Sequence, residues 1–246
     1  MKKTITIFRN FLFIIIFPFI GIGQTQIGSD IIGETANDYS GSFISMSADG
    51  SKVAIGAVFN SDNGDGSGQV RVYQNASGIW TQVGADINGE AIGDISGSSV
   101  SISADGNRVA IGARFNDGNG NNSGHVRVYK YEANVWTKVG ADIDGEAAND
   151  LSGASVSLSS DGSIVAIGAA GNDGNGDASG HVRVYKDILG VWTQVGADIN
   201  GEAANDNSGE RVSLSADGTI VTIGAAGNDG NGSNSGHVRI YDWNGI

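Results

Sequence analysis

The sequence predicts an all-β protein, a β-propeller built from four-stranded antiparallel blades, and three observations predict it. One pattern occurs four times with a period of 56 residues, and Asp49, Asp105, Asp161 and Asp217, each followed by glycine, mark its register. Apolar and polar residues alternate in short runs, as in half-buried strands, and no helical period is visible. The chain contains 40 glycines and one proline, which favours tight turns between short strands. Four short strands in a repeat of this length are typical of a propeller blade.

The N-terminal residues 1–23 predict a secretory signal peptide. Basic residues precede an apolar run over residues 11–22 that ends among glycines, which is the order found in cleaved leaders. The run is too short for a comfortable membrane span. The mature chain is therefore expected to begin at Gln24, to be secreted or held at the cell surface, and to have no membrane span after cleavage. An uncleaved N-terminal anchor is the alternative.

The repeat domain is predicted over residues 24–246. Its four copies span residues 28–83, 84–139, 140–195 and 196–246, without an insertion or a deletion between them. Because the copies stay in register, each is expected to fold as the same supersecondary unit and to pack against its neighbours.

The third copy illustrates the four strands expected in each repeat. They cover residues 155–159, 164–169, 181–186 and 191–195, and a tight Ser-Asp-Gly turn joins the first two. The second and third strands are separated by a long loop rich in Asn, Asp and Gly. A β-solenoid is the alternative, but its shorter coils leave a 56-residue period unexplained.

The fourth copy stops before its last strand. Residues 24–27 resemble that missing strand, so they are predicted to pair with the third strand of the last copy. Such pairing would close a four-bladed ring and cover the free sheet edges. A fragment of a larger propeller is the competing interpretation.

The charge and the cysteine content exclude two classes of function. The chain has 27 acidic and 14 basic side chains, a formal charge of −13, without a basic stripe. Such a surface repels phosphate backbones, which argues against nucleic acid as a partner. Because there is no cysteine, neither a disulfide framework nor thiol chemistry is available.

The third copy resembles a bacterial FG-GAP repeat, a family related to the blades of the integrin α-subunit propeller. The resemblance lies in Asp161-Gly162, in the runs over residues 152–156, 165–169 and 179–185, and in Val191–Gln194. It implies a propeller, an extracellular location and a role in adhesion or binding. Two departures stand out. The Phe-Gly pair occurs as Ser-Gly, and the calcium loop between the first two strands of integrin blades is shortened to Asp-Gly.

The long loops between the second and third strands predict calcium sites. Oxygen-bearing side chains alternate there, with the spacing of calcium loops, and the candidate ligands are Asp117, Asn119, Asn121, Asp173, Asn175, Asp177, Asp229 and Asn231. The match is partial, because the glycine and glutamate of an EF-hand loop are missing. The alternative is that these residues only form turns.

The two long loops of each repeat are expected at the same end of the sheet, where they form a candidate ligand face. Its acidic residues are Glu90, Asp94, Glu146, Asp150, Glu202 and Asp206. Binding residues favour long loops on a rigid scaffold, so this face is predicted to recognise an extracellular protein or a polysaccharide. The alternatives are a structural surface repeat and an accessory domain of a polysaccharide-degrading system.

The histidines and tryptophans are predicted to be structural. His125, His181 and His237 recur at one strand position, where the first copy has Gln69, and one tryptophan recurs beside apolar strand residues in each of the first three copies. Catalysis needs a unique set of residues in defined roles, whereas nearly every polar residue here recurs with the repeat. The sequence therefore predicts a protein without enzymatic activity.

Overall fold

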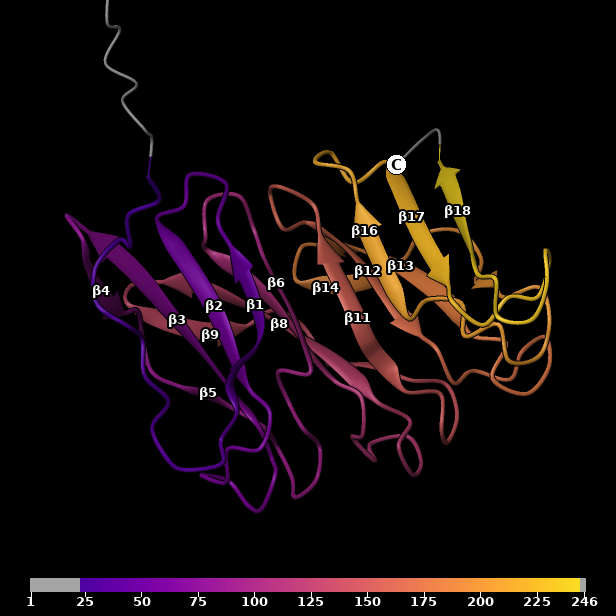
Figure 1. The fold of residues 1–246 in the computed structure, drawn as a ribbon, viewed down its shortest axis with the longest axis horizontal. Coiled ribbons are helices and arrows are strands. Elements are labelled where there is room, and N and C mark those ends of the chain that lie inside the picture. Colours follow the sequence, from indigo (N-terminus) through magenta and orange to yellow (C-terminus); the bar gives the residue numbers. More distant parts are fainter. Residues whose placement is uncertain (1–22, 244–246) are drawn as a thin grey trace, which may run out of the picture.

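The computed structural model describes residues 23–243, which form four antiparallel β-sheets and no helix. The sheets follow one another in sequence order, from indigo at one end of Figure 1 to yellow at the other. We call them units 1 to 4. The first strands of consecutive units lie side by side, as β1 with β6 and β6 with β11, which makes the row propeller-like.

Unit 1 shows the strand order that the next two units repeat. It consists of β1 (Ser40–Met46), β2 (Lys52–Ala57), β3 (Gln69–Ala76), β4 (Ile79–Gln82) and β5 (Ile87–Asn88). The strands β1 to β4 pair in chain order, and β5 pairs with the part of β3 that β4 leaves open.

The other units have corresponding strands. Unit 2 contains β6 (Ser99–Ile102), β7 (Arg108–Ala113), β8 (His125–Glu132), β9 (Val135–Lys138) and β10 (Ile143–Asp144). Unit 3 contains β11 (Ser152–Leu158), β12 (Ile164–Ala169), β13 (His181–Ile188), β14 (Val191–Gln194) and β15 (Ile199–Asn200). Unit 4 contains β16 (Arg211–Leu214), β17 (Ile220–Ala225) and β18 (His237–Asp242).

The four strands predicted for each repeat are present in units 1 to 3, and the all-β antiparallel fold is confirmed. In unit 3 the second strand has the predicted bounds, and the other three differ by a few residues at one or both ends. The two-residue strands β5, β10 and β15 were not predicted. A pair of residues is too short for an alternation pattern, so the sequence gives no periodic signal for them.

The Ser-Asp-Gly turn between the first two strands is held by its own side chains. In unit 3 the Asp161 carboxylate accepts hydrogen bonds from the Ser159 hydroxyl at 2.7 Å and from the Ser163 backbone N–H at 2.9 Å. Gly162 has a φ of +69°, which glycine adopts without strain. The aspartate is thus used inside the turn.

Apolar side chains between consecutive sheets form the core. The buried cluster between units 1 and 2 joins Ala54, Val70, Val72 and Ile87 of unit 1 to Ile102, Val109 and Ile111 of unit 2. Equivalent positions form the clusters between units 2 and 3 and between units 3 and 4. We call the side of each sheet that corresponds to Ala54, Val70 and Val72 its leading face, and the side that corresponds to Ile102, Val109 and Ile111 its receiving face.

The tryptophans pack at these interfaces, as predicted. Trp136 is half-buried against the cluster between units 1 and 2, and its indole N–H donates a 2.7 Å hydrogen bond to the Val83 carbonyl. Trp192 makes the equivalent bond to Val139 at 2.8 Å. A tryptophan of one unit therefore ties that unit to the chain leaving the unit before it.

Glycines allow the sheets to approach one another closely. A Cβ atom at Gly112 in β7 would overlap the carbonyl oxygen of Gly153, in the first strand of unit 3. The same pair of positions meets at the other two interfaces, as Gly56 with Gly97 and as Gly168 with Gly209. Because a side chain at either position would separate the sheets, these glycines are required by packing.

The predicted closure of a four-bladed ring is not seen in the described part of the chain. Unit 4 has three strands, and β18 pairs with β17 alone. Residues 24–27 instead lie near unit 1, where the Ile27 carbonyl accepts a 2.8 Å hydrogen bond from the Trp80 indole. Ile27 thus takes the same position beside Trp80 that Val83 takes beside Trp136. This equivalence explains why residues 24–27 resemble the end of a repeat.

The predicted leader lies outside the described residues, apart from Gly23. Among residues 23–243, no helix is long and apolar enough to cross a membrane.

We predict that Gly112→Ala destabilises the protein, because the added methyl group must push units 2 and 3 apart. Overpacking of this kind costs about 1 to 3 kcal/mol of unfolding free energy. Gly224→Ala is the matched control: it occupies the same strand position in unit 4, where the atom nearest to the added methyl group would lie 3.7 Å away. Urea denaturation of both variants measures the difference. Equal stability of the two would contradict the close approach of the sheets.

Candidate metal centre

One group of side chains in unit 2 combines an imidazole with carboxylates. His125 is the first residue of β8, and in the pairing of β10 with β8 it lies opposite Asp144. Glu90 arrives from the loop that leaves β5 of unit 1, and Asp142 precedes β10. The interface between units thus brings residues of two repeats together.

The spacing within this group suits an ion better than a direct hydrogen bond. His125 Nδ1 lies 3.9 Å from Glu90 Oε2 and also 3.9 Å from Asp144 Oδ1, beyond the usual hydrogen-bond distance. Ligand atoms of Glu90, His125 and Asp142 lie within 4.8 Å of one another. An ion about 2.1 Å from each ligand spans separations of up to about 4.2 Å. Small side-chain movements would therefore complete a coordination sphere.

Unit 3 repeats the group with one difference. His181 Nδ1 lies 3.8 Å from Glu146 Oε2, and Asp198 takes the place of Asp142. Asn200 stands opposite His181 in the pairing of β15 with β13, where unit 2 has Asp144. Unit 3 can therefore offer the same three ligands but lacks the fourth acidic group.

An arginine holds each glutamate in position. Arg127 Nη1 lies 3.4 Å from Glu90 Oε1, and its Nη2 donates to the Asn88 carbonyl at 2.9 Å. Arg183 repeats the arrangement with Glu146 at 3.5 Å. One carboxylate oxygen thus faces the guanidinium, which leaves the second oxygen directed toward the histidine.

Burial keeps the imidazole neutral. The His125 side chain is 2% exposed, and burial, aided by the nearby Arg127 charge, lowers its pKa from 6.5 to about 4. Burial and Arg183 lower the pKa of His181 in the same way. A neutral imidazole has the lone pair that a metal ion requires. Burial and the neighbouring Asp142 carboxylate raise the pKa of Asp144, so this group has a stronger affinity for a proton than an ordinary aspartate.

Unit 1 carries an all-oxygen variant of the group. Glu34, Asp62 and Asp86 come together, and Gln69 replaces the histidine. The buried Gln69 amide donates to Glu34 at 3.2 Å and to Asp62 at 3.1 Å, while its Oε1 is buried without a hydrogen-bond partner. Rotation of this amide would direct Oε1 toward the carboxylates and make it a fourth oxygen ligand.

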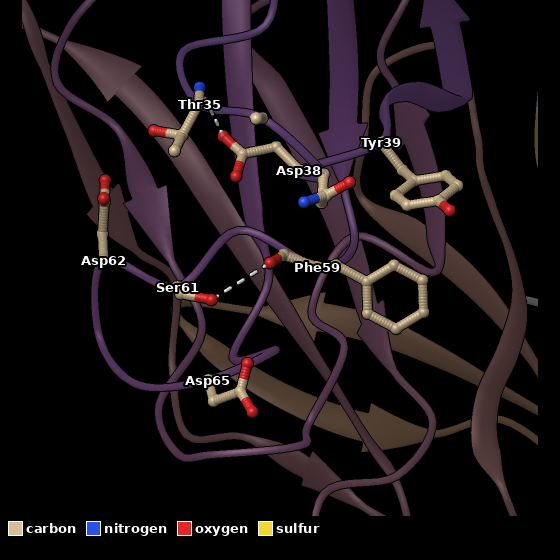
Figure 2. Close-up of a pocket in the computed structure, with 9 residues that line it drawn as sticks. Thr35, Asp38, Tyr39, Phe59, Ser61, Asp62 and Asp65 are labelled. Atoms are coloured by element: carbon tan, nitrogen blue, oxygen red, sulfur yellow. Dashed lines mark hydrogen bonds between the residues drawn. The ribbon is translucent and has the colours of Figure 1, made fainter.

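Two pockets adjoin these groups. The larger, of about 630 Å³, lies at unit 1 and includes Asp62 in its lining. Figure 2 shows the Tyr39 and Phe59 rings at its edge, with ring centroids 5.3 Å apart, and Asp65 farther along the β2–β3 loop that also carries Phe59. The smaller, of about 280 Å³, lies between units 2 and 3 and is lined by Asp142 and Asp144 of unit 2 and by Tyr185 and Trp192 of unit 3.

The loop residues predicted to bind calcium make hydrogen bonds within their own loop or to the neighbouring long loop. The Asp117 carboxylate accepts from the Asn122 backbone N–H at 2.7 Å. The Asn119 amide donates to the carbonyls of Gly145 and Glu146, at 2.8 and 3.0 Å. Unit 3 repeats both arrangements with Asp173 and Asn175, and Asp229 accepts from the backbone in unit 4. Asn121, Asp177 and Asn231 are exposed. Calcium binding by these loops stays a prediction.

The candidate ligand face divides into two kinds of residue. As predicted, the two long loops of a unit lie together, because the asparagine amides above join them. The glutamates Glu90, Glu146 and Glu202 are exposed, but the aspartates Asp94, Asp150 and Asp206 are at most 3% exposed. Each of these aspartates accepts a hydrogen bond from the backbone of its own turn, such as Ala91 to Asp94 at 3.1 Å. We therefore correct the prediction that the aspartates line the face.

The histidine–carboxylate groups were missed by sequence reasoning, which assigned the histidines to packing alone. A signal was present. Glutamate precedes histidine by 35 residues in three copies, as in Glu90 and His125, and aspartate follows 17 residues later in two of them. Spacings this long acquire meaning only when the pairing of the strands is known.

The fold of this chain is similar to that of solved protein structures. No family model and no curated protein matches the chain. Among solved structures, the hydrazine synthase of Kuenenia stuttgartiensis matches with a TM-score of 0.54 and 16% identity over 89% of this chain. The periplasmic gluconolactonase of Pseudomonas aeruginosa matches with a TM-score of 0.51 and 15% identity over 87% of this chain. The chain spans 49% and 60% of the lengths of these two proteins.

The comparison corrects two functional predictions. The sequence predicted a binding or adhesion module without enzymatic activity, whereas both of these structures are of enzymes. At this level of identity the likeness shows the fold alone. The fold of this chain is therefore one that enzymes use, and its own chemistry must be inferred from its own residues.

We predict that the buried histidines make the protein less stable in mild acid. Below pH 6.5 the unfolded chain takes up a proton at position 125 that the native protein, with a pKa of about 4, does not. Unfolding free energy therefore falls as the pH drops from 7 to 4, by about 3 kcal/mol for this residue. His125→Gln, which copies Gln69 of unit 1, is expected to remove that part of the loss. Chemical denaturation at several pH values, with a chelator present, measures it. An unchanged pH dependence in the variant would contradict a neutral, buried His125.

Proposed function

We propose that this chain is a metal-dependent hydrolase with its reaction centre in the unit 2 group. The observation that carries the proposal is that ligand atoms of Glu90, His125 and Asp142 lie within 4.8 Å of one another, with His125 Nδ1 3.9 Å from Glu90 Oε2. Nitrogen and carboxylate ligands in this combination suit zinc and related divalent ions. The use of this fold by enzymes supports the proposal but does not carry it.

Glu90, His125 and Asp142 are the proposed ligands. The neutral histidine approaches from the core, whereas the Glu90 side chain is 41% exposed. Solvent would therefore reach an ion held there from the carboxylate side, and catalytic metal sites keep one position open for water. A divalent ion held by these residues would lower the pKa of a bound water and polarise a carbonyl group.

Asp144 is the proposed general base. It lies beside the ligands without being needed to complete a set of three, and its raised pKa favours proton acceptance from water. Asn200 occupies this position in unit 3 and cannot accept a proton. Unit 3 is therefore proposed to bind an ion without catalysing hydrolysis.

The substrate is proposed to occupy the cleft of about 280 Å³ between units 2 and 3. A lining that combines the Asp142 and Asp144 carboxylates of unit 2 with the Tyr185 and Trp192 rings of unit 3 suits a small cyclic molecule with polar edges and an apolar face. Lactones are the class to test first, because one structure with this fold is a gluconolactonase. In such a reaction water adds to the carbonyl carbon, the ring C–O bond breaks, and the released oxygen takes up a proton to give a hydroxy acid.

The unit 1 group is proposed to prefer calcium. Its Glu34, Asp62 and Asp86 ligands are carboxylates, and the neighbouring Gln69 offers an amide oxygen. Hard oxygen ligands suit calcium or magnesium, whereas imidazole suits zinc. One chain would thus hold two kinds of ion. The choice would depend on one position of the repeat, which is glutamine in unit 1 (Gln69) and histidine in units 2 and 3 (His125 and His181).

We also propose that the protein is exported and related to FG-GAP repeat proteins. The N-terminal order of basic, apolar and small residues supports export. The in-register motifs quoted above support the relationship.

Asp144→Asn separates ion binding from catalysis, because it gives unit 2 the composition of unit 3. We expect wild-type protein, dialysed against zinc, to retain two ions in the histidine groups of units 2 and 3, and Asp144→Asn to retain both. Lactone hydrolysis by the variant should fall about 100-fold or more, as expected for loss of a general base. Elemental analysis and a pH-stat assay over a panel of lactones measure the two quantities.

His125→Gln is the matched variant for ion binding, and it should lose one of the two zinc ions and the hydrolytic activity. His181→Gln should lose one ion and keep the activity. If neither His125→Gln nor His181→Gln lowered the zinc content, the metal centre would be overturned. Full activity in Asp144→Asn would overturn the role of that residue, and a lack of hydrolysis across the panel would overturn the substrate class.

A further inference from the structure

The row of units ends in two exposed apolar faces. On the leading face of unit 4, Val238 and Ile240 are 64% and 68% exposed. On the receiving side of unit 1, the first-strand residues Ile44 and Met46 are 67% and 56% exposed, whereas Val53 and Ile55 in β2 are 7% and 8% exposed. Apolar patches that face solvent in this way mark interaction sites.

These two faces are the halves of the interface that already occurs three times inside the chain. Val238 and Ile240 hold the positions of Val182 and Val184, which are 0% and 2% exposed between units 3 and 4. Met46 holds the position of Ile102, which is 7% exposed between units 1 and 2. The exposed residues of the two end faces therefore hold positions that are buried at the inner interfaces.

The polar contacts of the interface also have both partners available. A serine hydroxyl in the first strand of one unit accepts a hydrogen bond from the backbone of the next, as Ser45 from Ile102, Ser101 from Leu158 and Ser157 from Leu214. Ser213 and the backbone N–H of Met46 hold the next positions in this series. The backbone bonds from Ala48 to Ala104, from Ala104 to Ser160 and from Ser160 to Ala216 form a second series, which Ala216 and Ala48 would continue.

Unit 4 lacks, among residues 23–243, the two-residue edge strand that units 1 to 3 contain. Val70, Val126 and Val182 each pair with an isoleucine of a two-residue strand, which is Ile87, Ile143 and Ile199 in turn. The corresponding Val238 in β18 has no such strand in the described chain. Ile31 is the equivalent of Ile87, one repeat earlier in the sequence. In the described chain residues 31–32 belong to no strand, and Ile32 is 77% exposed.

We infer that a second copy of this chain covers these faces, head to tail. The leading face of unit 4 in one copy packs on the receiving face of unit 1 in the other, and residues 31–32 of the second copy pair with β18 of the first. Units 1 and 4, which carry the two faces, lie at the two ends of the row in Figure 1. A contact between unlike faces leaves one unused face on each copy, so it extends the assembly or closes it into a ring.

Two charge substitutions at exposed positions test the inference. Ile240→Asp disables the unit 4 face and Ile44→Asp disables the unit 1 face. Both side chains are at least two-thirds exposed, so each variant should keep the thermal stability of the unassembled chain. Sedimentation velocity of the full mature chain at about 0.15 M salt measures assembly. Wild-type protein should form assemblies of whole chains, and each variant should need about 100-fold higher concentration to do so.

Mixing the two variants shows whether the contact joins two different faces or two copies of the same face. Ile44→Asp retains an intact unit 4 face and Ile240→Asp an intact unit 1 face, so an equal mixture should form a complex of one copy of each and nothing larger. Leu189→Asp, at a fully exposed turn, is the control and should assemble like wild type. Wild-type protein that stays monomeric at all concentrations would overturn the inference, as expected if the chain closes on itself. A mixture that fails to associate would overturn the head-to-tail arrangement.

Discussion

The close packing of each sheet on the next is the constraint on which the rest of this structure depends. Each unit is a sheet of three to five short strands, too small to bury its own apolar residues. Stability comes from the contact between a leading face and a receiving face, where residues such as Val70 and Ile111 are fully buried. Glycines at the contact, as at Gly112 and Gly153, bring the backbones so close that no side chain fits between them.

The same packing creates the candidate metal centre. The chain must cross from one sheet to the next, and the crossing loop that follows β5 of unit 1 places Glu90 beside His125, the first residue of β8 in unit 2. The two-residue strand β10 then sets Asp144 opposite His125. Because these contacts depend on the spacing of the sheets, a substitution that moves the sheets apart is expected to disturb the ion site as well. The arginines beside the glutamates link the two effects, since Arg127 bonds to both Glu90 and the chain leaving unit 1.

Much of the fold could be predicted from the sequence, because the pattern of each strand recurs in several copies of the repeat. The alternation around Val182 and Val184 and the Asp161-Gly162 turn were sufficient to place the four strands of unit 3. The site was harder. Glu90 and His125 are far apart in sequence, and their proximity follows from how one unit packs on the next, which alternation does not encode. Asp150 illustrates the opposite error, since an acidic loop residue was assigned to the surface although its carboxylate is buried in its own turn.

Anomalous diffraction from crystals grown with zinc is the most direct test of the metal centre. Data collected on both sides of the zinc absorption edge locate the ion without reference to activity or stability. We predict a peak within bonding distance of His125 Nδ1 and of carboxylate oxygens of Glu90 and Asp142, and a second peak at the equivalent place beside His181. Crystals with no peak at either histidine, in which the imidazole bonds directly to a carboxylate, would contradict the metal centre.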